Sequence, residues 1–180
     1  MLQVTIPATE QWDESTEEFI TSKEQKLLLE HSLVSVAKWE SKWNKPFLSS
    51  VDKLTAEESL DYVKCMTLNK DVDPNVYRRI PKDTMEKISE YITAPRTATI
   101  LPKERGRGSR EPVTSELIYY WMVALTIPFE CQKWHLNRLM TLIGVCNLKN
   151  KPPKKHSKRQ IMSRNAALNA ARRQQLGTSG

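Results

Sequence analysis

The sequence predicts a mainly α-helical protein, a multi-helix domain built around a central helical hairpin at about residues 113–147. The most apolar stretch of the chain lies there and includes two of its five tryptophans. Elsewhere, residues of the capping-box type precede apolar residues at helical spacing, which is typical of amphipathic helices. A small β-hairpin near the N-terminus and a basic helix at the C-terminus complete the expected fold.

The first thirty residues mix strand and loop signals. Residues 1–6 alternate and include β-branched residues, so we expect a short strand, and the polar residues 8–18 should form a loop. The segments 19–21 and 26–31 then fit a small hairpin. The alternative is one helix from Ser22, which also opens a capping box. We slightly favour the hairpin.

Helical segments and a short turn follow. One helix starts at Ser32 and must end near Asn44, because a proline lies two residues further on. Another starts at the capping box opened by Thr55. A short helical turn follows Asp73, whose neighbour is a proline, and residues 83–92 form an amphipathic helix.

The central hairpin is predicted from two apolar segments separated by a proline. Thr114 or Ser115 caps the first helix, which ends before Pro128 because the residue preceding a proline is pushed out of the α region. Its apolar residues are Leu117, Ile118, Trp121, Met122, Ala124 and Leu125. A second helix is expected from about Phe129, with an apolar face too wide for a surface helix. That face consists of Leu136, Leu139, Met140, Ile143 and Val145.

Composition divides the chain into four parts. They are an N-terminal region (1–95), a mobile basic loop (96–112), the central helical hairpin (113–150) and a basic linker with the C-terminal helix (151–180). The last part contains eight Lys or Arg and no Asp or Glu, so residues 1–150 hold 20 basic and 21 acidic residues. The net charge of +7 therefore belongs to the tail. Most such runs are solvated, although they can bind nucleic acid or an acidic partner.

Weakly stable segments are the expected contact elements, because they can become ordered on binding. The C-terminal helix, capped by Ser157, is rich in alanine but has a thin apolar face and is marginal alone in water. Trp39 and Trp43 are either interface anchors or core residues. The partner-binding candidates are Trp39, Trp43, Arg105, Arg107, Arg110, Ile161, Leu168, Arg172 and Arg173.

We find no arrangement of catalytic or ligand-binding residues and expect no enzyme, cofactor or metal. Cys131 and His135 are four residues apart, but no second pair supplies the remaining metal ligands. Gly106-Arg107-Gly108 lacks the ending of a phosphate loop. The three cysteines form no disulfide framework, which favours a reducing cytoplasm. We also expect no signal peptide and no membrane association, since no run of eighteen apolar residues occurs.

The central hairpin has one alternative interpretation. A helix, a turn and a second helix carrying Gln132, Lys133, Asn137 and Arg138 would fit a DNA-reading helix-turn-helix. Such a helix must present polar residues to base edges, whereas this one is apolar over much of its surface. We therefore favour a core role and do not expect nucleic acid as a partner.

Three segments resemble a known family. They are EHSLVSVAKWESKWNKPF, SELIYYWMVALTIPFECQKWHLNRLMTLIGVCNLKN and SRNAALNAARRQQLGTSG, spread over most of the chain. They look like the tail assembly chaperones of long-tailed bacteriophages. The resemblance implies a non-enzymatic protein of the host cytoplasm that binds the tape-measure protein and keeps it soluble, as a homo-oligomer or in multiple copies on the client. The alternatives are a small phage nucleic-acid-binding protein or a structural component of the virion.

Overall fold

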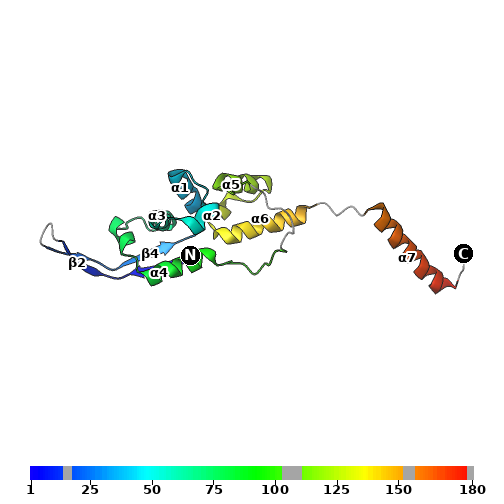
Figure 1. Ribbon diagram of the computed structural model, residues 1–180, viewed down its shortest axis with the longest axis horizontal. Helices are drawn as coiled ribbons and strands as arrows, with labels where there is room; N and C mark the ends of the chain where they lie inside the picture. The colour runs from blue at the N-terminus through cyan, green and yellow to red at the C-terminus, as the bar shows by residue number, and fades with distance from the viewer. Residues whose placement is uncertain (14–17, 103–110, 152–156, 178–180) are drawn as a thin grey trace. The chain divides into compact units, whose positions relative to one another are not determined.

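The computed structural model of the protein describes residues 1–13, 18–102, 111–151 and 157–177, with the backbone alone for 11–13 and 18–20. The chain is mainly α-helical, as the sequence predicts, and divides into two compact units, Met1–Leu148 and Lys149–Gly180 (Figure 1). No helix within the described ranges is long and apolar enough to cross a membrane.

The N-terminal strands pair as nested antiparallel ladders. β1 (Leu2–Ile6) pairs with β4 (Gln25–Leu29), and β2 (Thr9–Asp13) pairs with β3 (Glu18–Ser22). Both ladders keep the same register: the two residue numbers of each pair give the same sum, from Leu2 and Leu29 to Asp13 and Glu18. They are therefore continuous parts of one long hairpin. The interruption falls at Pro7, which has no N–H to donate to a ladder.

This hairpin corrects three sequence predictions. The predicted loop 8–18 contains β2 and the start of β3. The segments 19–21 and 26–31 are extended but do not pair with each other, and the helix from Ser22 does not form. The predictions failed because β2 has no apolar alternation of its own and is extended by pairing with β3.

Helix α1 (Leu33–Trp43) packs against α2 (Phe47–Ser50), α3 (Ala56–Met66), α5 (Ser115–Ala124) and the 3₁₀ segment η3 (Phe129–Lys133). It starts at a capping box of Ser32 with Ser35 and ends at Asn44, which is left-handed with φ of 53°. Both ends agree with the sequence prediction. The Glu40 carboxylate joins three helices, since it accepts hydrogen bonds from the first backbone N–H groups of α2 (Phe47, 2.8 Å) and α5 (Ser115, 2.7 Å).

The next elements also begin where their caps predict. After the short 3₁₀ segment η1 (Val51–Lys53), α3 (Ala56–Met66) opens with a capping box of Thr55 and Glu58. The 3₁₀ segment η2 (Pro74–Arg79) follows Asp73, and α4 (Lys82–Thr93) buries Ile88 and Tyr91.

The central segment contains α5 (Ser115–Ala124), η3 (Phe129–Lys133) and α6 (Leu136–Asn150). The second helix thus begins at Leu136 and not at Phe129. The chain is extended at Trp134, because His135 pairs with Ser32 and the Leu136 N–H donates to the His31 carbonyl at 2.7 Å. On α5, Ile118 and Met122 are fully buried, whereas Leu117 and Trp121 are only partly buried and Ala124 is exposed.

The second unit contains α7 (Lys158–Leu176). Ser157 and Gln160 form its predicted capping box, and Gly177 ends it in the left-handed conformation with φ of 62°. No residue of α7 is buried. The helix thus has complete caps at both ends.

Candidate interaction surfaces

The largest exposed apolar side chains of the first unit's helices gather on α5 and η3. Tyr120 is 64% exposed, Val123 60% and Phe129 54%. Tyr119 joins them, since its ring lies 6.4 Å from that of Phe129 and its hydroxyl donates to Gln132 Oε1 at 2.9 Å. We call Tyr119, Tyr120, Val123 and Phe129 the α5–η3 patch.

The patch exists because α5 is apolar on more than its buried face. Ser115, Ile118 and Met122 point into the core, and Tyr120 and Val123 lie on another side. A helix that contacts nothing but the core has polar residues on its other faces. An exposed cluster of aromatic and aliphatic residues instead marks a binding surface.

The sequence analysis did not single out the patch. It predicted a buried face of Leu117, Trp121, Ala124 and Leu125, widened by Ile118 and Met122. The structure buries Ile118 and Met122 fully and Leu117, Trp121 and Leu125 in part, and it exposes Ala124. The signal was available, however: no charged residue occurs between Glu116 and Glu130. A helix that is apolar on every side has more apolar surface than one contact with the core can bury.

Helix α7 carries the predicted contact residues of the tail. Ile161 and Leu168 are 46% and 47% exposed, and Arg172 and Arg173 are exposed as well. The helix holds five basic residues and no acidic one; the basic residues are Lys158, Arg159, Arg164, Arg172 and Arg173. An isolated helix of this length is marginal in water without a packing surface.

The two tryptophans of α1 belong mainly to the fold. Trp39 is fully buried, and its Nε1 donates to the Glu58 carbonyl at 3.0 Å. The ring therefore fits the core role, one of the two alternatives that the sequence leaves open for it. Trp43 is half-buried, stacks on Trp39 with 6.2 Å between ring centroids, and donates from Nε1 to Asp61 Oδ2 at 2.9 Å.

Lysines next to these tryptophans form ion pairs with α3. Lys42 contacts Asp61, and Lys45 contacts Glu58. Burial raises the pKa of Asp61, but hydrogen bonds from Lys42 and Trp43 outweigh it and hold the pKa below the usual range. The lysines are thus committed to the α1–α3 contact. The remaining candidates, Arg105, Arg107 and Arg110, lie outside the described residues.

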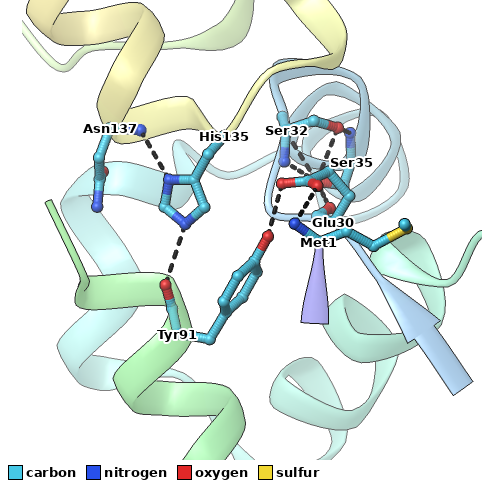
Figure 2. Close-up of polar contacts among 7 residues, drawn as sticks. All are labelled: Met1, Glu30, Ser32, Ser35, Tyr91, His135 and Asn137. Carbon is cyan, nitrogen blue, oxygen red and sulfur yellow. Dashed lines mark hydrogen bonds and ion pairs between the residues drawn. The ribbon is translucent and has the colours of Figure 1, made fainter. Parts of the chain in front are cut away.

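A buried polar network joins the N-terminal strands to the helices (Figure 2). The Tyr91 hydroxyl of α4 donates to Glu30 Oε1 at 2.7 Å, and the Met1 ammonium contacts Glu30 Oε2 at 2.8 Å. His135 Nδ1 accepts from the Asn137 backbone N–H at 3.3 Å, so Nε2 carries the proton and donates to the Tyr91 carbonyl at 3.0 Å.

His31 and His135 face each other in this interior, with 5.1 Å between ring centroids. Burial, and then the neighbouring His135, lower the pKa of His31 to about 3. Burial also lowers the pKa of His135 and raises that of Tyr62, which hydrogen-bonds His31 Nδ1. Both imidazoles are therefore neutral at physiological pH and act as hydrogen-bonding packing groups. Among the described residues, no group of His, Cys, Asp and Glu could hold a metal ion.

Two residues of the helix-turn-helix alternative, Asn137 and Arg138, are engaged within the protein. The Asn137 amide donates to the backbone carbonyls of Ile92 and Ala94, at 2.9 and 2.8 Å. The Arg138 guanidinium lies 4.1 Å from the centre of the Trp134 ring. A base-reading role would require these side chains to leave their partners.

An apolar groove with a volume of about 260 Å³ lies between α2–η1, α3 and α4. Its apolar lining includes Phe47, Leu54, Tyr62, Met85, Ile88 and Ile92. Pockets for drug-sized ligands begin at about 300 Å³, so the groove suits an apolar side chain of a bound helix better than a cofactor.

Comparisons of the chain with protein-family models, with curated proteins and with solved structures found no match. The exposed surfaces of the two units are thus the observations from which function must be inferred.

Proposed function

We propose that the protein is a non-enzymatic tail assembly chaperone of a long-tailed bacteriophage. It binds the tape-measure protein in the host cytoplasm during tail assembly and keeps it in solution. The proposal is supported first by the α5–η3 patch, which lies within one of the segments that resemble these chaperones. Aromatic side chains held on a rigid helix are typical anchors for an apolar partner.

The chemistry of the patch fits a helical client. A long client presents apolar stripes at helical spacing, and each stripe can cover Tyr120, Val123 and Phe129 while its polar face stays in water. A single contact of this size is weak. Several copies on one client can together cover its apolar stripes along their length.

Co-expression with the tape-measure protein of the same phage tests this function. The full chain should retain the client in the soluble fraction, also at high salt, because the contact is apolar. The variant Tyr120→Ser, Val123→Ser, Phe129→Ser should lose most of the soluble client, since truncation of a binding hot spot costs about 2 kcal/mol or more. Leu68→Ser is the matched control, because Leu68 is 54% exposed on another part of the surface. Equal retention by the triple variant would rule out the patch as the client site.

A second candidate is nucleic-acid binding, which the exposed basic helix α7 supports. Binding of this kind releases counterions, so affinity would fall steeply with salt. Salt-sensitive retention of DNA or RNA without client binding would favour it. Finding the protein in purified virions would instead favour a structural component.

A further inference from the structure

The molecule carries two exposed apolar surfaces whose charged neighbours have opposite sign. On α5, Glu116 lies one turn before Tyr120 on the same side of the helix, and Glu130 directly follows Phe129. Both carboxylates are exposed. Lys133 is the one basic residue of α5 and η3, at the far end of η3. The α5–η3 patch is therefore an apolar surface with an acidic margin.

Helix α7 has the complementary arrangement. Ile161, Arg164, Leu168 and Arg172 follow one another at three- and four-residue steps, so they share one face. The two apolar side chains lie two turns apart, and an arginine stands beside each. This α7 face can cover an apolar surface and pair with carboxylates at its edge.

We propose that α7 of one copy docks on the α5–η3 patch of a second copy. Ile161 and Leu168 cover Tyr120 and Val123, and Arg164 and Arg172 pair with Glu116 and Glu130. The inference rests on the proposed function, because it says what covers the client-binding patch before the client arrives. Such a contact joins different surfaces of the two copies, so the pair as a whole keeps one free patch and one free helix.

A second copy fits α7 for two reasons. The helix needs a packing surface to be stable, and the apolar patch with carboxylates at its edge complements it in both polarity and charge. Repetition of the contact then produces an open row of copies. Because the client binds the same patch, it must displace α7 of the neighbouring copy, so this row is the form that the protein takes without its client.

Sedimentation of two full-length variants tests the contact. The patch variant (Tyr120→Ser, Val123→Ser) and the helix variant (Ile161→Ser, Leu168→Ser) each lose one of the two surfaces. The wild-type chain should form oligomers that grow with concentration, and each variant alone should be monomeric. An equimolar mixture should stop at a 1:1 dimer, because one intact patch and one intact helix remain. Met162→Ser is the control, since Met162 is 72% exposed but lies off the proposed face.

Charge exchange provides an independent check. Arg164→Glu with Arg172→Glu should abolish oligomers, and adding Glu116→Lys and Glu130→Lys to the same chain should restore them, because every contact then pairs opposite charges again. Circular dichroism must show an unchanged helix content for every variant.

Three results would overturn the inference: a wild-type chain that stays monomeric at every concentration, no dimer in the mixture of the patch and helix variants, or oligomers that vanish after nuclease treatment. Monomeric wild type would also result if α7 docked on its own chain. A chain that solubilises the client without forming oligomers would refute this inference and leave the proposed function intact. Oligomers that never retain the client would refute the proposed function and leave this inference intact.

Discussion

The buried imidazole of His31 makes the stability of the first unit depend on pH. Its pKa is about 3 in the folded protein, against 6.5 when exposed. Between these values the unfolded chain binds a proton that the folded chain does not, so stability is complete above about pH 6.5 and falls as the pH is lowered toward 3. The shift corresponds to at most about 4–5 kcal/mol.

We therefore expect the urea midpoint to drop between pH 7.5 and pH 4.5. His31→Gln should lower the midpoint at pH 7.5 but reduce its dependence on pH. His156→Gln is the control, because it removes the histidine that lies outside the described residues. If wild type and His31→Gln show the same pH dependence, His31 is not the group responsible.

Glu40 illustrates a residue whose role depends on tertiary structure. Its two carboxylate oxygens each accept a backbone N–H, from Phe47 and from Ser115. Glu40→Gln leaves one of these N–H groups facing an amide NH₂, so we expect a loss of about 1–3 kcal/mol in the free energy of unfolding. Glu86→Gln, on the exposed side of α4, should change it little. Chemical denaturation measures the free energy of unfolding of both variants. If Glu40→Gln leaves it unchanged, the two N–H groups find other acceptors.

Residues such as Glu40, whose partners are distant in the sequence, limit what can be predicted about single side chains. Ser32 and Thr55 were recognisable as caps because their partners lie three residues along the chain. Glu40 caps a helix that starts 75 residues later, a contact that no local pattern contains. Trp39 remained undecided for the same reason, because the backbone of α3 that accepts its Nε1 proton is distant in sequence.

At the level of elements, helices with local caps were predictable and paired strands were not. Helices α1, α3, α4 and α7 begin within a residue or two of the predicted starts, since capping and apolar spacing are local signals. Strand β2 is polar and gains its order from β3 across the hairpin. The α5–η3 patch was missed because periodicity identifies apolar faces but does not say which of two will be buried.

A strained residue lies two positions after the last residue of α5. Thr126 has φ of 53°, a left-handed conformation that β-branched residues rarely adopt. Asn tolerates this region better, so Thr126→Asn should raise the free energy of unfolding by about 1 kcal/mol. Thr93→Asn is the control, because Thr93 lies within the helical turn of α4, where the substitution should give no gain. Thermal unfolding of the two variants tests this prediction. A lower stability of Thr126→Asn would show that the contacts of the threonine side chain contribute more than its left-handed backbone conformation costs.

At the level of the whole molecule, the division into two units separates stability from association. The core of the first unit is supplied by β1, β4, α1 and α3–α6, and α7 has no buried residue. Deletion of residues 151–180 should therefore leave the thermal midpoint unchanged, because no apolar area is lost from the core. It should also remove concentration-dependent oligomers, since every copy then lacks the helix that docks on its neighbour. Circular dichroism melting and sedimentation velocity of the shortened and full chains measure the two effects. A lower melting temperature after deletion would mean that the tail packs on the body, and persistent oligomers would place the contact between copies elsewhere.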